Sequence, residues 1–169
     1  MSKIRLAGIV GDSIVDGPGI RVAIFTQGCP HHCEGCHNPQ SWAFDGGYEM
    51  DIEDIYTKIC SNPLARGVTF SGGEPFCQAA PLRELAQMIK DRGLELAIYT
   101  GYVFEELQAM NDESVNGLIE LADIIVDGPF IRARRNLDLK FRGSDNQRII
   151  NIKKTLQSGS VVIDDSTRW

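Results

Sequence analysis

The 169-residue sequence has no long hydrophobic run, no excess of positive charge and no evenly paired set of cysteines. The apolar stretch near the N-terminus, Ile4–Val10, is interrupted by Arg5 and is too short for a signal peptide or a membrane-spanning helix. With 17 Lys and Arg against 23 Asp and Glu, the formal net charge is −6. That charge disfavours binding to nucleic acid or to an anionic membrane. We therefore expect a cytoplasmic protein with no nucleic-acid partner and no membrane partner.

Cysteine is scarce, and its five copies form an odd number that makes a poor disulfide framework. Three of the five crowd into one short segment, which in a reducing compartment suggests a metal site. The sequence also lacks repeats, low-complexity tracts and linker-like stretches. A hydrophobic content of 43% and a charged content of 24% are ordinary for a globular protein. The length and this uniformity predict one domain over residues 1–169.

Short apolar runs alternate with helical periods along the chain. Strands are predicted at 22–26, 67–71, 94–100 and from 123, and helices at 52–60, 82–89 and 104–121, the last broken near Asn111. Strand alternating with helix predicts βαβ units, hence an α/β fold with a mostly parallel sheet. Because a closed eightfold barrel takes roughly 250 residues, we expect an open, partial βα barrel. Residues 130–169 are less regular, with weak strand patterns at 147–152 and 160–163.

Cys29, Cys33 and Cys36 follow directly on the first predicted strand. Their spacing lets one short loop, 29–37, turn three thiols toward one point. Thiolates favour zinc, copper(I) or iron–sulfur clusters. A [4Fe–4S] cluster ordinarily takes four cysteines, one per iron. Three cysteines would leave one iron free to bind the amino and carboxylate groups of a substrate.

A zinc-binding interaction module is the alternative, with a histidine of the same loop as fourth ligand: His31, His32 or His37. Structural zinc sites usually show a second pair of close cysteines, whereas Cys60 and Cys77 are isolated. We interpret both of these cysteines as core packing. Since adjacent histidines cannot both point inward, we interpret the first two as solvated loop residues. The third is placed to pack against the cluster or its bound substrate.

The segment Ser71–Pro75 follows the second predicted strand. Ligands of α/β folds bind beyond the carboxyl ends of the strands, so this turn and the cysteine loop should open on the same face. Gly72 and Gly73 allow the backbone to approach a ligand closely. Glu74 can accept a hydrogen bond from a bound ammonium group. The same turn could also simply start a helix, with Glu74 favouring the helix dipole.

These two motifs together resemble the radical S-adenosylmethionine superfamily, with its CX3CX2C cluster motif and its GGE motif. The segments at 16–21, 28–30 and 36–39 resemble the activating enzymes of glycyl-radical proteins. Three later segments are similar to the branch that activates anaerobic ribonucleoside-triphosphate reductase: Thr100–Tyr102, Val126–Phe130 and Arg142–Gln147. The resemblance covers roughly residues 8–150.

The resemblance implies a [4Fe–4S] cluster on the three cysteines and S-adenosylmethionine bound beside it. Reductive cleavage would give a 5′-deoxyadenosyl radical, which removes a hydrogen atom from a glycine of the reductase. Flavodoxin or ferredoxin is implied as electron donor, and no acid–base catalytic residue is expected. The residues expected around the cofactor are Gly35, Cys36, His37, Gly72, Gly73, Glu74, Thr100 and Asp127. Gly35 replaces an aromatic residue that often packs near the adenine, so the adenine must be held by backbone or by another segment.

Two other substrates remain as alternatives: pyruvate formate-lyase and a small molecule. Val126–Gly128 replaces a lysine-bearing motif of pyruvate formate-lyase activases, which disfavours that type of activase. The second alternative is a radical enzyme that acts on a small molecule instead of a protein. A local basic stretch at 132–154 is interpreted either as a docking surface for an acidic partner or as a solvated face.

Overall fold

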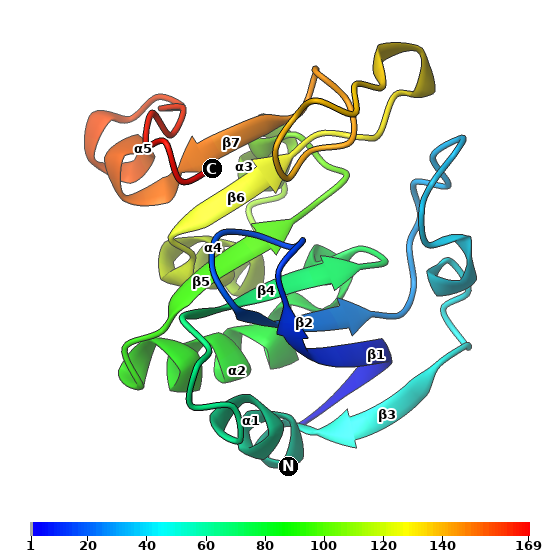
Figure 1. Ribbon diagram of the computed structural model, residues 1–169, viewed down its shortest axis with the longest axis vertical. Helices are drawn as coiled ribbons and strands as arrows, with labels where there is room; N and C mark the ends of the chain where they lie inside the picture. The colour runs from blue at the N-terminus through cyan, green and yellow to red at the C-terminus, as the bar shows by residue number, and fades with distance from the viewer. Residues whose placement is uncertain (1) are drawn as a thin grey trace.

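The computed structural model describes residues 2–169, and one seven-stranded sheet organises them in the order β3-β1-β2-β4-β5-β6-β7 (Figure 1). The strands are β1 (Lys3–Ser13), β2 (Arg21–Thr26), β3 (Tyr48–Asp51), β4 (Gly67–Gly72), β5 (Glu95–Tyr99), β6 (Ile124–Asp127) and β7 (Arg148–Asn151). The central strands β2, β4, β5 and β6 run parallel. The pairings β3–β1, β1–β2 and β6–β7 are antiparallel. The sheet is open, because β3 and β7 at its edges pair with one neighbour each.

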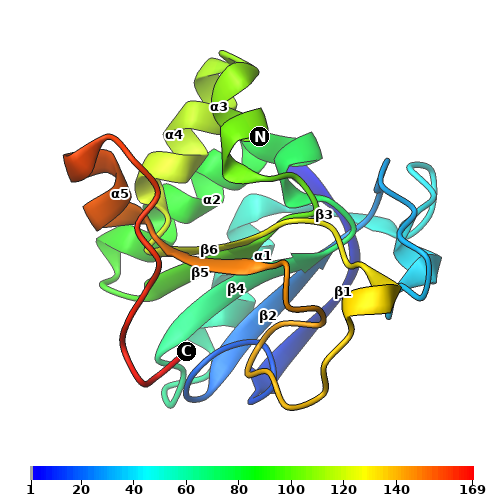
Figure 2. The same cartoon turned by 90° about the horizontal axis from the view of Figure 1, so that it is seen from above.

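Five α-helices accompany the sheet: α1 (Ile52–Cys60), α2 (Ala79–Asp91), α3 (Phe104–Ala109), α4 (Glu113–Leu121) and α5 (Ile152–Ser158). Three short 3-10 helices are η1 (Pro39–Ser41), η2 (Pro75–Gln78) and η3 (Arg132–Arg134). Figure 2 shows α2 to α5 on one side of the sheet. The loop after β1, the segment after β6 and the C-terminal tail lie on the other side. Within residues 2–169, no helix is both long enough and apolar enough to cross a membrane.

The helices follow the apolar periodicity that predicted them. In α2, Leu82, Leu85 and Ile89 are fully buried against the sheet, and Gly93, with φ +84°, follows the helix end. The predicted break near Asn111 is confirmed, since that residue has φ +49° between α3 and α4. Asp112 then caps α4 by accepting a hydrogen bond of 2.9 Å from the amide of Val115. Periodicity and capping therefore place the main core on the helical face.

The margins of the sheet differ from the prediction. The stretch around Ile4–Val10 lies within the long strand β1, whose antiparallel pairing the sequence did not indicate because only Ile4 and Leu6 of it alternate as buried positions. Strand β3 and helix α5 were likewise not predicted. The weak strand at 160–163 is wrong as a strand, since it contributes one isolated bridge between Ile163 and Ile150. The α/β class and the open sheet with a parallel centre are confirmed.

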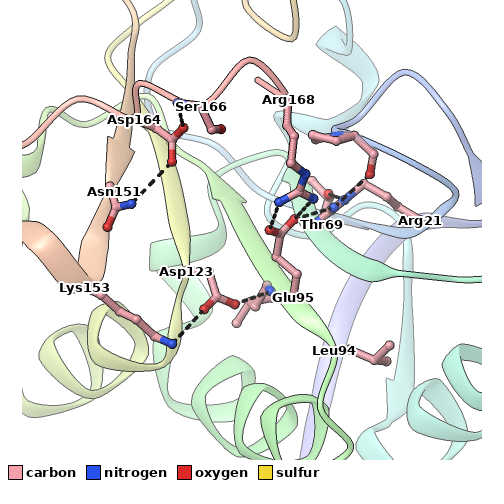
Figure 3. Close-up of polar contacts among 12 residues, drawn as sticks. Arg21, Thr69, Leu94, Glu95, Asp123, Asn151, Lys153, Asp164, Ser166 and Arg168 are labelled. Carbon is pink, nitrogen blue, oxygen red and sulfur yellow. Dashed lines mark hydrogen bonds and ion pairs between the residues drawn. The ribbon is translucent and has the colours of Figure 1, made fainter.

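A buried ionic network holds the amino ends of the parallel strands (Figure 3). Arg21 is fully buried, and its Nη1 lies 2.7 Å from Oε1 of Glu95. Its Nε donates to the hydroxyl of Thr69 at 2.8 Å. Arg168 reaches the same glutamate at 3.1 Å, and the ring of Trp169 lies 5.6 Å from the Arg21 guanidinium carbon. We call these five residues the amino-end network; the cysteine loop lies at the opposite ends of the strands.

Candidate functional site

A cavity of about 150 Å³ opens at the carboxyl ends of the parallel strands. Its lining brings the three cysteines of the loop after β2 together with Gly72 and Gly73 from the end of β4 and Thr100 from the end of β5. The arrowheads of these strands point to one side in Figure 1, where the loops after β2 and β6 both stand. Parallel strands explain this convergence, because all their carboxyl ends meet at one edge. We call this space the thiol cavity.

The three cysteines differ in burial. Cys29 is 8% exposed, whereas Cys33 and Cys36 are half-buried. Burial raises the pKa of the Cys29 thiol, and hydrogen bonds from the amides of His31 and His32 lower it by less. The amide of Asn38 donates to the Cys36 sulfur at 3.4 Å. One backbone amide thus donates to the Cys36 sulfur, and two others limit the rise in the pKa of the Cys29 thiol.

Within residues 2–169, no three Cys, His, Asp or Glu side chains stand close enough together to hold a metal ion as they are. The donor set nevertheless fits an iron–sulfur cluster. Three soft thiols line one cavity, and amide-to-sulfur hydrogen bonds are the interactions that tune and stabilise cluster thiolates. The residues therefore suit a cluster held by the cysteine loop.

The histidines that the zinc alternative requires are each engaged elsewhere. The His31 ring is hydrogen-bonded to Glu74 at 2.7 Å. The His32 ring stacks on Trp42 with 4.5 Å between ring centroids, and the His37 ring lies 5.5 Å from the ring of Phe130. Of these contacts, the one that occupies a ring nitrogen is the hydrogen bond of His31, which disfavours this histidine as a zinc ligand.

Glu74 is fully buried, and its carboxylate is surrounded by hydrogen-bond donors. These are the amide of Phe76 (3.1 Å), the hydroxyl of Thr100 (2.8 and 2.9 Å), the amide of Gly101 (2.8 Å) and Nε2 of His31 (2.7 Å). An ionised carboxylate offers about four acceptor positions, so four donors saturate it. A ligand ammonium group could bind this side chain only by displacing one of them. Glu74 also begins η2 through its bond to Phe76, as the helix-start interpretation expects.

The interpretation of His31 as a solvated residue is wrong, because its side chain is only 16% exposed and packs edge-on against Tyr102 at 4.5 Å. Its neighbour His32 is exposed, as expected. Cys77 is exposed rather than part of the core, and Cys60 is half-buried. Partial desolvation, aided by the charge of Glu74, raises the pKa of Cys77 to about 11, so it remains a neutral thiol. The one sequence signal for His31 was its position between two cluster cysteines.

The glycines of the turn are needed because backbone segments touch there. A Cβ on Gly73 would lie 2.4 Å from the carbonyl oxygen of Gly28, and Gly72 has φ +88°. The amide of Glu74 donates to that same Gly28 oxygen at 2.8 Å. The turn after β4 is therefore fastened directly to the start of the cysteine loop.

Gly35 lies beneath an aromatic side chain from another segment. A Cβ on Gly35 would approach the Phe130 ring to 3.2 Å, and its φ is +77°. Phe130 and His37 both line the thiol cavity, so aromatic surface reaches it from the segment after β6. This aromatic wall was not predicted from the sequence.

Asp127 is a predicted site residue that, like Gly35 and Glu74, does not line the thiol cavity. Its buried carboxylate accepts from the amide of Phe104 at 2.8 Å and from Nη2 of Arg148 at 2.5 Å. Arg148 also pairs with Glu105 at 2.9 Å, and its bonds to the two carboxylates raise its pKa. Asp127 thus joins β6, β7 and the start of α3.

A larger trough of about 590 Å³ adjoins the thiol cavity. The two share six lining residues: His37, Asn38, Ser71, Tyr99, Phe130 and Gln147. The other wall of the trough comes from the segment Val10–Asp16. The side chain of Gln147 accepts from the amide of Gly143 at 2.8 Å and donates to the carbonyl of Gly128 at 3.1 Å. The hydrogen bonds of the motif 142–147 therefore hold the segment after β6 beside the thiol cavity and the trough.

With this geometry in place, the chain can be compared with known proteins. A family model described as a 4Fe-4S single cluster domain matches residues 15–150, which include the whole thiol cavity. The chain belongs to this family. The resemblance drawn from its motifs is confirmed, and the cluster class of its metal site with it.

Within this family the chain is similar to proteins named anaerobic ribonucleoside-triphosphate reductase-activating protein. The one from Vibrio cholerae is 35% identical over 144 residues, which are 80% of this chain and 90% of that protein. The one from Escherichia coli K12 is 32% identical over 83% of this chain and 94% of that protein. A pyruvate formate-lyase-activating enzyme from Clostridium pasteurianum is 34% identical over 73% of this chain but only 55% of its own length. The two reductase-activating proteins thus match over nearly their full length, whereas the lyase-activating enzyme matches over about half of its own.

In this 4Fe-4S family member, most charges of the basic stretch 132–154 are compensated locally. Arg132 pairs with Glu34 at 3.2 Å and Arg134 with Asp145 at 2.5 Å. Among the residues described, ion pairs also involve Arg148, Lys153 and Lys154. This pairing favours the solvated-face interpretation over a docking surface.

Proposed function

We propose that the chain activates anaerobic ribonucleoside-triphosphate reductase by reductive cleavage of S-adenosylmethionine, producing a glycyl radical on that partner. The observation that carries this proposal is the convergence of three thiols and the Gly72–Gly73 turn on one cavity. The names of full-length relatives support the same partner.

In the proposed enzyme, Cys29, Cys33 and Cys36 hold one [4Fe–4S] cluster. When bound, the reduced cluster supplies the single electron that cleaves the sulfonium of S-adenosylmethionine and leaves a carbon-centred radical. The chain itself contributes positioning. Gly72 and Gly73 bring bare backbone to the cavity wall, where the methionine end would bind. Thr100 acts through Glu74, which fixes that turn.

The aromatic wall suggests how the adenine is held despite Gly35. Phe130 covers this glycine, and His37 packs against Phe130 at 5.5 Å. Together they offer an apolar surface against which a planar base can stack. Asp127 has no part in cofactor binding in this proposal, because its carboxylate is committed to Arg148 and Phe104.

The trough gives the proposed partner a route to the cavity. It is larger than the thiol cavity, continuous with it through shared lining residues, and lined by the loop after β1 and the segment after β6, on the side of the sheet opposite α2 to α5. The open sheet corresponds in this proposal to a partial barrel whose unclosed side admits a polypeptide loop. No side chain near the thiols is assigned as acid or base, since hydrogen-atom removal needs none. Flavodoxin or ferredoxin is the proposed electron donor, and the cytoplasm the proposed compartment.

Anaerobic reconstitution tests the proposal. The protein is loaded with iron and sulfide, reduced with dithionite and incubated with S-adenosylmethionine, and 5′-deoxyadenosine is measured by chromatography. We expect a brown protein that forms the product, and a Cys33→Ala variant that does not. Equal yields from the two proteins would refute the proposal, and a colourless protein with stoichiometric zinc would favour the interaction module.

A second step identifies the partner. Anaerobic ribonucleotide reductase and pyruvate formate-lyase are incubated separately with the reduced enzyme, and the glycyl radical is sought by electron paramagnetic resonance. We expect the radical on the reductase. A radical on the lyase alone would favour the alternative that the Clostridium pasteurianum relative represents.

A further inference from the structure

Two adjacent histidines of the cysteine loop have different environments, and the difference concerns how the loop is held. His32 is exposed and stacks on Trp42. His31 turns inward, where Nε2 lies 2.7 Å from Oε1 of the fully buried Glu74. The carboxylate already accepts from the amides of Phe76 and Gly101 and from the hydroxyl of Thr100, and we assign His31 Nε2 as a further donor to it.

The inward position of His31 is sterically defined as well as hydrogen-bonded. A Cβ on Gly101 would lie 2.4 Å from the His31 ring, so the ring packs directly on the backbone after β5. Tyr102 covers it edge-on at 4.5 Å. Ring packing and the bond to Glu74 together fix the side chain to the ends of β4 and β5.

The same residue is close to the first cysteine along the chain. Pro30 alone separates His31 from Cys29, and the proline ring fixes its own φ, which limits how far the two residues can move apart. Cys29 is therefore connected through Pro30 and His31 to a saturated buried carboxylate. Among residues 2–169, no side-chain hydrogen bond of a residue next to Cys33 or Cys36 reaches the sheet in this way, and both cysteines are half-buried.

We propose that His31 is a positioning residue that tethers the cysteine loop to Glu74 and so presets Cys29, before any metal is bound, as the fixed member of the three thiols. Cys33 and Cys36, which lie farther along the loop, complete the ligand set afterwards. The tether rests on the proposed function only in treating Cys29 as a cluster ligand.

The test uses the full-length, cluster-free protein under reducing, anaerobic conditions. Each cysteine is alkylated with iodoacetamide at one fixed pH, and its rate is followed by mass spectrometry of peptides. His31→Phe keeps a ring on Gly101 but removes the donor to Glu74. His31→Gln restores an amide donor close to the Nε2 position. His32→Asn is the matched control, since His32 has φ +48° and asparagine tolerates a positive φ.

We expect His31→Phe to accelerate alkylation of Cys29 by about tenfold, the equilibrium equivalent of one hydrogen bond to a charged group. His31→Gln and His32→Asn should stay close to the wild-type rate. Cys60 in α1 reports global unfolding and should not respond. An unchanged Cys29 rate in His31→Phe would overturn the tether, as would a His31→Gln rate equal to that of His31→Phe. Equal acceleration at Cys29 and Cys60 would assign His31 to global stability instead and also overturn it.

Because these rates are measured without cluster or S-adenosylmethionine, their outcome is independent of the proposed function. An unchanged Cys29 rate in His31→Phe, when the wild-type protein forms 5′-deoxyadenosine, would contradict the tether alone. An intact tether in a protein that forms no 5′-deoxyadenosine would contradict the proposed function alone.

Discussion

Two fully buried charged side chains stand at opposite ends of the same parallel strands, and they are satisfied in different ways. Arg21, in the amino-end network, faces a carboxylate from the start of β5, which in turn binds Arg168. Glu74, at the carboxyl ends, faces hydroxyl, amide and imidazole donors. The first is an ion pair between residues of β2 and β5, which lie on either side of β4 in the sheet. The second gathers its donors from loops.

We expect the ion pair of Arg21 to affect the stability of the whole fold and the hydrogen bonds of Glu74 to affect the assembly of the site. A buried arginine left without its carboxylate is an uncompensated charge, so its loss acts on the stability of the whole sheet. The donors of Glu74 come from the turn after β4, the end of β5 and the cysteine loop. Removing one of them should loosen the relation between these segments more than the sheet itself. The two ends can therefore be tested separately.

The largest stability effect is expected from Glu95→Gln. It leaves the Arg21 guanidinium buried without a carboxylate, although Thr69 still accepts from it. We expect a loss of about 3 kcal/mol in the free energy of unfolding, at the lower end for breaking a buried pair, measured by urea denaturation. The yield of 5′-deoxyadenosine per folded molecule should be unchanged.

Glu49→Gln is the matched control, because it breaks the exposed pair with Arg5 at 3.1 Å and should cost less than about 1 kcal/mol. Equal losses in Glu95→Gln and Glu49→Gln would show that the amino-end pair contributes nothing special to stability.

Thr100→Val acts at the other end and should cost about 2 kcal/mol, within the range for leaving a buried acceptor with one donor fewer. The hydroxyl it removes donates to both oxygens of Glu74, while the side-chain shape is kept. Unlike Glu95→Gln, this variant should lower the 5′-deoxyadenosine yield per folded molecule. Thr57→Val, on the exposed face of α1, is the control and should change neither quantity. A normal yield of 5′-deoxyadenosine in Thr100→Val would contradict the idea that the Glu74 contacts, unlike the Arg21 ion pair, serve the site.

The sequence predicted the carboxyl-end site better than the amino-end network, for a physical reason. Local spacing identifies Cys29, Cys33 and Cys36, and a strand followed by glycines identifies the turn. Arg21 and Glu95 are separated by most of two βα units, and nothing local to either one indicates the other. His31 escaped prediction similarly, because its partner comes from the end of a different strand.

Asp127 shows the limit of inference from position alone. It occupies a strand end as Thr100 does, yet its side chain faces Phe104 and Arg148 rather than the thiol cavity. Alternation does not separate the two residues, because Tyr99 pairs with Val126 and the next positions, Thr100 and Asp127, follow in the same register. Their partners separate them, since Thr100 donates to Glu74 whereas Asp127 accepts from Phe104 and Arg148. The strand end was predictable, but these partners from other segments were not.

Gly101→Ala tests whether the packing of the His31 ring at the carboxyl ends of the strands matters for cluster loading. Its Cβ would meet the His31 ring at 2.4 Å, so either the ring or the backbone must move, at a cost of about 1 kcal/mol for modest overpacking. We expect reduced iron and sulfide incorporation on reconstitution, measured by metal analysis. Gly11→Ala has open space around its Cβ and should incorporate iron normally. Normal incorporation in Gly101→Ala would mean that the loop accommodates a displaced His31.

The smallest effect is expected from Arg135→Glu, in the basic stretch that belongs to neither buried site. Arg135 is exposed, and within residues 2–169 no carboxylate pairs with it, whereas Arg134 beside it pairs with Asp145. Reversing a solvated charge should change the free energy of unfolding by less than about 0.5 kcal/mol. Affinity for the reductase, measured by titration at low salt, should change by less than about twofold, since the neighbouring charges are already compensated. A loss greater than about tenfold that high salt abolishes would instead make this stretch a docking surface, because screening weakens exposed charge pairs selectively.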